Sequence, residues 1–216
     1  HGLFIALLPT WGDKFHLCWG QGPVIFTEEN ARVYGQWIGQ RYAEKENIIW
    51  MLGGDRRLEP PHRRIIDAMA AGIRQADPHH LITFHPTGCS TSLDELPDAD
   101  YLDFHTAQTG HDVSQCWETD RVILRMAARS GKPCMDAEPR YEDHPACFDT
   151  ELGYFWQAKD VRQNLYWNLF SGACGHTYGN HCIWSMTKEP SAYFPFRWQD
   201  ALEHPGAGQM GFGKQL

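Results

Sequence analysis

The stretch IIWMLGGD, residues 48–55, decides how the rest of the sequence is interpreted. The uninterrupted apolar run 48–52 is typical of a strand covered on both faces, as in a parallel sheet. Two glycines then let the backbone bend, and Asp55 follows at the carboxyl end of the predicted strand. Folds built on parallel sheets carry their chemistry at this position.

The same alternation of apolar runs and helical patterns repeats along the chain. Further strands are predicted at 3–8, 81–85, 101–105, 133–138 and 174–178. Helical patterns follow Thr27 as a cap, begin at Pro60, run from 117 to 129, and follow Asp160 as a cap. Strands separated by helices predict an α/β fold with a parallel sheet.

Two parallel architectures fit this pattern. A doubly wound nucleotide-binding sheet would carry a glycine-rich turn after its first strand, but residues 9–13 read PTWGD, and neither GxGxxG nor a P-loop occurs. A (β/α)8 barrel instead gathers polar side chains from the ends of many strands. Polar residues at or just past predicted strand ends are Asp13, Asp55, His85, His105 and Glu138. We therefore expect a (β/α)8 barrel of the TIM type, incomplete because only six strand units are visible.

Composition excludes several classes of function. The chain has 216 residues, with 19 Lys and Arg against 27 Asp and Glu, and a formal net charge of −8. Binding to nucleic acid or to an anionic membrane uses clustered Lys and Arg, so neither partner is expected. The apolar runs are far shorter than the roughly 18–20 residues that span a bilayer. The length suits one core, and residues 1–216 are expected to form a single partial catalytic domain.

Two strand-end carboxylates are the candidate catalytic groups. Asp55 follows the glycine pair, and Glu138 ends the strand 133–138 just before Pro139. On strands of one barrel, both would rise on the same face, and two facing carboxyl groups are the minimum for glycoside hydrolysis. The alternatives are that Asp55 caps a helix or pairs with Arg56, and that Glu138 pairs with Arg140.

The twelve histidines raise the alternative of a zinc site. No HExxH occurs, and the pairs at 105/111 and 176/181 lack the i, i+4 spacing of a zincin helix. A site assembled from separate strands would leave no local spacing signature. We expect no metal ligands and no cofactor. Hydrogen bonding to sugar hydroxyls is the role expected for His85, His105, His111 and His176.

Nucleophilic serine or cysteine chemistry is weakly supported. No GxSxG elbow occurs, and no cysteine lies in a recognisable catalytic signature. The seven cysteines are dispersed without a CxxC pair, which predicts free or buried thiols rather than a disulfide framework.

Aromatic residues crowd the segments that follow the predicted strands. Such rings stack on the apolar faces of sugars, and they also pack helices onto barrels. They are Trp11, Trp19, Tyr141, Tyr154, Phe155, Trp156, Tyr178 and Trp184.

Seven ordered motifs run along nearly the whole chain. They are LPTWGD (8–13), NIIWMLGGDR (47–56), ITFHP (82–86), QTGH (108–111), DAEPRYED (136–143), SGACGHTYG (171–179) and PGAGQM (205–210). Together they closely resemble the apiosidase-like (β/α)8 glycoside hydrolases, which are glycoside hydrolase family 140 and its relatives. Compared with that family, the chain corresponds to strands three to eight of the barrel.

The resemblance implies a retaining hydrolase that removes apiose-containing units from plant pectin, with an oligosaccharide or polysaccharide as its partner. It implies that Asp55 is the acid/base and Glu138 the nucleophile. The full set of expected substrate-binding residues is Trp11, Asp13, Arg56, His85, His105, Gln108, His111, Tyr141, His176 and Tyr178. By analogy with polysaccharide-degrading relatives, we expect export, although the chain begins without a signal peptide. The alternative is a non-catalytic carbohydrate-binding relative or an inactive fragment.

Overall fold

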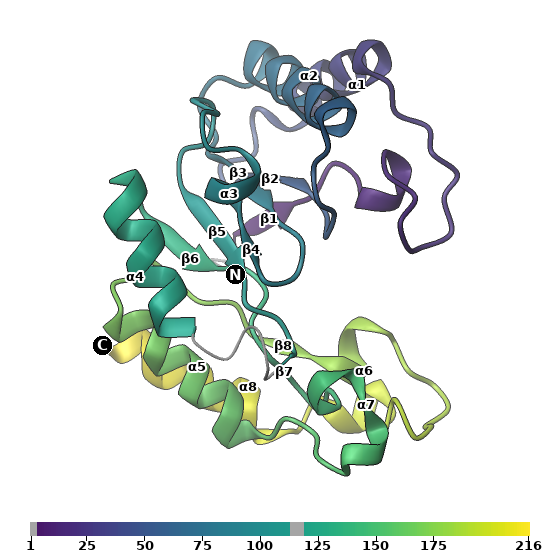
Figure 1. Ribbon diagram of the computed structural model, residues 1–216, viewed down its shortest axis with the longest axis vertical. Coiled ribbons are helices and arrows are strands. Elements are labelled where there is room, and N and C mark those ends of the chain that lie inside the picture. The colour runs from purple at the N-terminus through teal and green to yellow at the C-terminus, as the bar shows by residue number, and fades with distance from the viewer. Residues whose placement is uncertain (1–3, 113–118) are drawn as a thin grey trace. The chain divides into compact units, whose positions relative to one another are not determined.

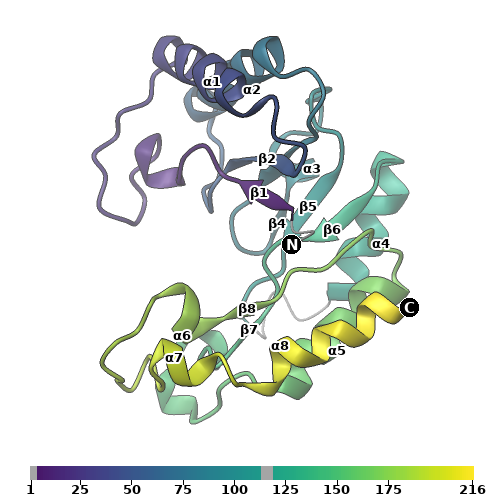
Figure 2. The same ribbon diagram turned by 180° about the vertical axis from the view of Figure 1, so that it is seen from behind.

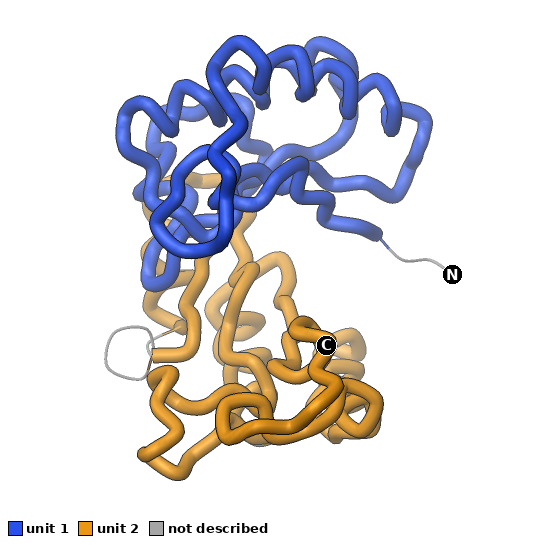
Figure 3. Tube along the Cα trace, turned by 90° about the vertical axis from the view of Figure 1, so that its right-hand side faces the viewer, with its two compact units in different colours: residues 1–106 blue, residues 107–216 orange. Residues whose placement is uncertain are grey.

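The computed structural model describes residues 4–112 and 119–216. The chain divides into two compact units, His1–Thr106 and Ala107–Leu216, which Figure 3 colours separately. Both units combine helices with short strands, so the predicted mixed α/β class is confirmed. Within the described ranges, the strands form three small sheets, and none of these sheets is a closed barrel.

The first unit follows the order expected of a parallel α/β fold (Figure 1). A parallel sheet of order β1-β2-β3 places Ile5 beside Ile48 and Gly53 beside His85. Because all three strands run the same way, their carboxyl ends lie at one edge of this sheet. The elements are β1 (Ile5–Leu7), η1 (Gly12–Lys14), α1 (Glu28–Tyr42), β2 (Ile48–Gly53), α2 (Pro60–Ala76), β3 (Ile82–His85), β4 (Ser90–Thr91) and α3 (Ser92–Glu95), with η marking a 3-10 helix.

Helices α1 and α2 pack side by side, as both ribbon views show (Figures 1 and 2). The predicted cap begins α1: the Thr27 hydroxyl accepts from the Asn30 N–H, and the Asn30 side chain accepts from the Thr27 N–H. Glycine is needed where the helices meet. A Cβ atom on Gly35 would lie 2.4 Å from the Met69 carbonyl oxygen. The lack of a side chain at Gly35 therefore allows the backbones of α1 and α2 to approach closely.

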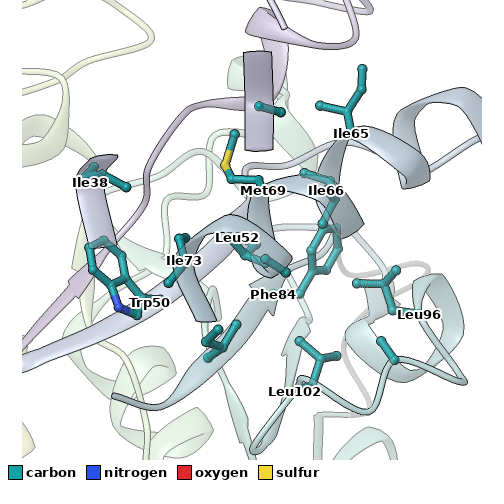
Figure 4. Close-up of a cluster of buried hydrophobic side chains, with 14 of the residues drawn as sticks. Ile38, Trp50, Leu52, Ile65, Ile66, Met69, Ile73, Phe84, Leu96 and Leu102 are labelled. Atoms are coloured by element: carbon teal, nitrogen blue, oxygen red, sulfur yellow. The ribbon is translucent and has the colours of Figure 1, made fainter. Parts of the chain in front are cut away.

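The core of the first unit lies around the side chains of β2, β3 and α2 (Figure 4). Trp50 is fully buried, and its indole N–H donates to the Asp77 carboxylate over 2.7 Å. Buried donors need such partners, because an unpaired polar group in a core is costly. The labelled core side chains are Ile38, Trp50, Leu52, Ile65, Ile66, Met69, Ile73, Phe84, Leu96 and Leu102.

The second unit combines longer helices with very short strands. Strand β5 (His105–Gln108) crosses the boundary between the units, and it is the middle strand of the order β4-β5-β6. Strands β7 and β8 pair in parallel, and α8 and η4 pack along α5 (Figure 2). The elements are α4 (Thr119–Ser130), β6 (Cys134–Asp136), β7 (Tyr141–Glu142), η2 (Ala146–Phe148), η3 (Thr150–Leu152), α5 (Ala158–Phe170), β8 (Gly179–Asn180), α6 (His181–Trp184), α7 (Trp198–Ala201), α8 (Pro205–Gln209) and η4 (Met210–Gln215).

Several predicted boundaries are corrected by the structure. The strand expected at 101–105 begins at His105, because Leu102 and Phe104 fill a buried turn. The strand expected at 174–178 makes only an isolated bridge, between Asp136 and His176, and the paired residues are 179 and 180. The cap of α5 is Gln157 rather than Asp160, which lies three positions later and completes a capping box. The predicted helix start at 117 lies outside the described residues.

The described cysteines follow the expectation of free thiols except for Cys89, and Cys116 lies outside the described residues. Cys18, Cys134, Cys147, Cys174 and Cys182 are free. Cys89 is disulfide-bonded. It is exposed in the turn before β4, where its side chain does not pack as a small hydrophobe. In the part of the chain that the structure describes, no helix combines the length and apolar character required to traverse a bilayer.

Candidate functional site

Asp55 is positioned by the glycine turn that ends β2. Gly53 and Gly54 have φ angles of +90° and +119°, a region that side chains rarely tolerate. A Cβ on Gly53 would lie 2.5 Å from the Phe84 ring, so the turn also needs the missing side chain. Asp55 itself has φ +60°, a costly conformation for a residue with a side chain and one that is enriched at functional sites.

A loop that follows β1 is fixed by Asp13. The Asp13 carboxylate accepts from the backbone N–H of Gln21 and of Gly22, and from the ammonium group of Lys14. Burial acts to raise the pKa of Asp13, but the Lys14 ammonium and the Gly22 N–H lower the pKa below its usual value. In this structure, Asp13 therefore holds the loop 13–22 through its ionised form. Its predicted contact with substrate stays a prediction.

Arg56 is buried beneath the same loop. Its guanidinium donates to the backbone carbonyls of His16, Asp55 and Trp19. The guanidinium carbon also lies 4.3 Å from the centre of the Trp19 ring, and the residue is only 1% exposed. Arg56, predicted to bind substrate, thus directs two donors at the loop, and its Nη1 atom also lies 3.8 Å from Oδ2 of Asp55, the ion pair that the sequence left open as an alternative.

Two tryptophans lie beside the carboxyl end of β2. The Trp19 indole N–H donates to Oδ2 of Asp55 over 3.1 Å. The Trp11 ring meets the His85 ring edge-on, with 5.6 Å between the centres, and Trp11 would contact a Cβ added to Gly54. The first unit therefore brings together four predicted site residues, namely Trp11, Asp13, Asp55 and Arg56, with His85 beside Trp11.

His105 has a different surrounding within the first unit. Its Nδ1 atom is 2.9 Å from the Ser92 hydroxyl, which also accepts a hydrogen bond from the Thr106 N–H. The imidazole is buried at the start of β5. The structure places His105 in this network, and its predicted contact with substrate stays a prediction.

Glu138 follows β6 in the second unit and lies beside His111. The Glu138 Oε1 atom is 3.5 Å from His111 Nε2, and the Glu138 carbonyl accepts from the Gly110 N–H. The Tyr141 N–H points at His111 Nδ1 over 3.4 Å, which assigns the ring proton of a neutral His111 to Nε2, facing the carboxylate. Three predicted site residues, Glu138, His111 and Tyr141, are therefore brought together here.

Three histidine rings pack in series, those of His111, His144 and His181. His111 lies parallel to His144 with 4.0 Å between ring centres, and His144 meets His181 edge-on at 4.3 Å. Burial, with His111 and His181 adjoining, lowers the pKa of His144 to about 2, and burial lowers the pKa of His181 to about 4. Both rings are neutral near pH 7. The sequence offered no signal for this stack, because its members come from three separate segments.

The remaining predicted residues, Gln108, His176 and Tyr178, have partners and surroundings of their own. Gln108 is buried at the end of β5, and no described residue donates to its Oε1 atom. His176 contacts the Asn168 side chain over 2.7 Å, and the Tyr178 hydroxyl donates to Glu142 over 2.6 Å. His176 and Tyr178 line a cavity of about 320 Å³ with residues of α5 and η4, and Glu138 is not among its lining residues.

The chemistry available in each unit is that of an oriented carboxylate. Asp55 accepts from an indole N–H, and Glu138 faces an imidazole N–H, so both have donors that favour the ionised form. Within residues 4–112 and 119–216, no three His, Cys, Asp or Glu side chains gather as metal ligands would.

Comparison with known proteins gives consistent matches. The family model described as "Apiosidase-like, catalytic domain" matches residues 1–216. A solved structure titled "Glycoside hydrolase" is similar at a TM-score of 0.87 and 32% identity, over 99% of this chain and 51% of that one. A glycoside hydrolase family 5 structure from Bacteroides vulgatus ATCC 8482 has a TM-score of 0.86 and 34% identity, over 99% and 48%. The chain thus spans about half the length of these structures.

No curated protein matches the chain. The family model nevertheless covers the chain from end to end, and the motifs around Asp55 and Glu138 occupy the strand ends described above. The chain therefore belongs to the family of apiosidase-like catalytic domains.

Proposed function

We propose that this chain is the catalytic part of a glycoside hydrolase in which Asp55 and Glu138 are the two working carboxylates. The observation that carries the proposal is that each carboxylate lies beside an N–H group: Asp55 accepts a hydrogen bond from the Trp19 indole, and the Glu138 Oε1 atom lies 3.5 Å from His111 Nε2. Oriented carboxylates at strand ends are the equipment that this chemistry needs. The finer proposal is that the strands belong to a (β/α)8 barrel and that residues 1–216 are one partial catalytic domain.

In the proposed reaction, Glu138 is the nucleophile. Its oxygen attacks the anomeric carbon while Asp55 gives its proton to the leaving oxygen, which forms a covalent glycosyl-enzyme. Asp55 then takes a proton from water, the water oxygen bonds to the anomeric carbon, and Glu138 leaves as a carboxylate. The N–H of His111 supports the ionised form of Glu138 that attack requires, and the proton-donor role of Asp55 is the one that the family resemblance implies.

The proposed substrate is a plant cell-wall polysaccharide, specifically apiose-containing units of pectin. Support comes from the family to which the chain belongs and from half-exposed indoles beside Asp55, which suit the apolar face of a sugar. The proposal includes retention of configuration at the anomeric carbon.

The test is hydrolysis of pectin oligosaccharides by the wild type and by Glu138→Gln and Asp55→Asn, followed as release of reducing sugar. Each substitution is expected to lower kcat by at least about a thousandfold with the fold retained, since it removes the nucleophile or the proton donor. Glu151→Gln, at an exposed glutamate of η3, is the matched control and should retain full turnover.

The anomeric form of the first product, followed by proton NMR, tests retention. With a glycosyl fluoride as substrate, whose leaving group departs without a proton donor, azide is expected to restore turnover to Asp55→Asn by attacking the glycosyl-enzyme without base assistance. Wild-type turnover by either carboxylate variant would refute the proposal. Saturable binding of the oligosaccharides with no product would favour a non-catalytic carbohydrate-binding relative instead.

A further inference from the structure

Trp19 combines three properties that no other described tryptophan shares. Its indole N–H is bonded to the carboxylate proposed as the proton donor, Asp55. Arg56 lies 4.3 Å from the ring centre and covers one face. The residue is nevertheless 49% exposed. A large apolar ring is thus presented to solvent next to the candidate catalytic group.

The position of Trp19 is held by the surrounding loop. The buried Arg56 guanidinium donates to the Trp19 carbonyl as well as lying against its ring. On the other side, Asp13 binds the backbone N–H groups of Gln21 and Gly22. A Cβ on Gly20 would lie 2.8 Å from the Asp13 side chain, so the loop packs closely onto its anchor. Two buried charged side chains thus hold an exposed indole in one place, as a preorganised binding surface requires.

We propose that Trp19 is the platform on which the leaving-group sugar stacks. The inference rests on the proposed function. A proton donor must come within about 2.6–3.2 Å of the glycosidic oxygen that it protonates. The Trp19 nitrogen is itself 3.1 Å from the Asp55 carboxylate, so its ring lies within about one sugar ring of that oxygen. When the glycosidic bond breaks, this oxygen stays with the leaving-group sugar, which lies on the Asp55 side of the bond. The leaving-group sugar is therefore the one that stacks on the Trp19 ring.

The chemistry of the platform defines its ligand. The face opposite Arg56 can take the C–H face of a pyranose ring, because flat apolar surfaces pair well with aromatic rings. The ligand class is therefore a pyranose leaving group that presents its C–H face to the ring. Trp11, also 44% exposed near the end of β2, lies edge-on to His85, so it is not assigned to this subsite.

The variants Trp19→Ala and Trp19→Phe separate stacking from the N–H bond. With pectin oligosaccharides as the probe, Trp19→Ala is expected to raise KM about tenfold, the effect of losing one stacked ring. Trp19→Phe retains a ring and should stay within about threefold of the wild-type KM. With a glycosyl fluoride of the same cleaved sugar, whose leaving group is not a sugar, both variants should keep the wild-type KM.

Trp37→Ala is the matched control. Like Trp19, Trp37 is an exposed tryptophan beside an arginine: it is 53% exposed and has the Arg41 guanidinium 5.7 Å from its ring centre, but it lies on α1 rather than on the loop 13–22. It should leave both KM values unchanged. Circular dichroism and thermal unfolding of each variant show that a raised KM does not come from a misfolded chain.

The outcomes separate the two proposals. If the wild type turns over the oligosaccharide and Trp19→Ala keeps its KM, the platform is refuted while the proposed function stands. An equal rise in KM for the fluoride also refutes it, because the ring would then serve the cleaved sugar or the loop. If the wild type binds without turnover, a tenfold weaker Kd for Trp19→Ala by calorimetry supports the platform, and an unchanged Kd refutes it. If the wild type neither binds nor cleaves the oligosaccharides, both proposals fall.

Discussion

Lowering the pH from 7 to 5 is expected to destabilise the second unit, because it buries three histidines in their neutral form. Burial, with help from neighbouring rings, lowers the pKa of His144 to about 2, and burial lowers the pKa of His176 and of His181 to about 4. In the unfolded chain each would titrate near its ordinary value of about 6.5. Near pH 5.5 the unfolded chain therefore binds close to three protons that the folded unit does not.

The sign follows from the direction of these shifts. A depressed histidine pKa contributes stability that is fully present above about pH 6.5 and is lost as the pH falls. Asp136 acts oppositely, because burial raises its pKa to about 6 and the folded unit keeps a proton that the unfolded chain has released. The net difference is about two protons, which corresponds to a slope of about 3 kcal/mol per pH unit between pH 6 and 5. A small domain is stable by only about 5–15 kcal/mol, so the effect should be large.

The assay is urea denaturation at half-unit steps from pH 7 to 5, combined with hydrogen exchange of α5 peptides corrected for the intrinsic pH dependence. His181→Phe removes one of the three histidines and should reduce the slope by about half. His79→Gln, at an exposed histidine of the first unit, should leave the slope unchanged. A second unit whose stability is constant or rises between pH 6 and 5 would refute the reasoning.

Two further predictions concern stability. Asp77→Ala should cost the first unit about 1–3 kcal/mol in urea denaturation, because it leaves the buried Trp50 indole N–H without its acceptor, and Asp77→Asn should cost less. Gly72→Ala should also lower the free energy of unfolding, by about 1–3 kcal/mol, although alanine favours helices. The added Cβ would lie 2.2 Å from a backbone oxygen of α1. A gain in stability would contradict this close contact. Gly208→Ala is the matched control, since a Cβ there meets nothing within 4 Å, and it should stabilise the chain by about 0.5–1 kcal/mol.

Much of the first unit could be predicted from local pattern. The run 48–52 became β2, the Thr27 cap began α1, and the double proline began α2. These signals are local, because a buried strand needs a continuous apolar run and a helix needs its first N–H groups satisfied. The second unit was harder, since its strands are only two or three residues long and tertiary contacts decide where they pair.

The candidate site likewise contains residues that the sequence could predict and residues that it could not. Asp55 and Glu138 could be proposed as functional residues because they follow predicted strands, and the glycine pair before Asp55 marks a turn. The sequence did not distinguish Trp19 from the other aromatic residues near predicted strand ends. What distinguishes it is a hydrogen bond to Asp55, and that bond joins positions 36 apart in the chain. No local pattern encodes such a contact.

The sequence by itself determined the α/β class, the principal strand ends and the family, because periodicity, caps and ordered motifs are properties of short segments. Only the tertiary structure decided what the polar residues do. It placed Arg56 and Asp13 under a loop, turned the His111 proton toward Glu138, and buried His144 as a neutral ring. The reason is physical: hydrogen bonding and desolvation depend on which segments meet, and that is settled only when the chain has folded.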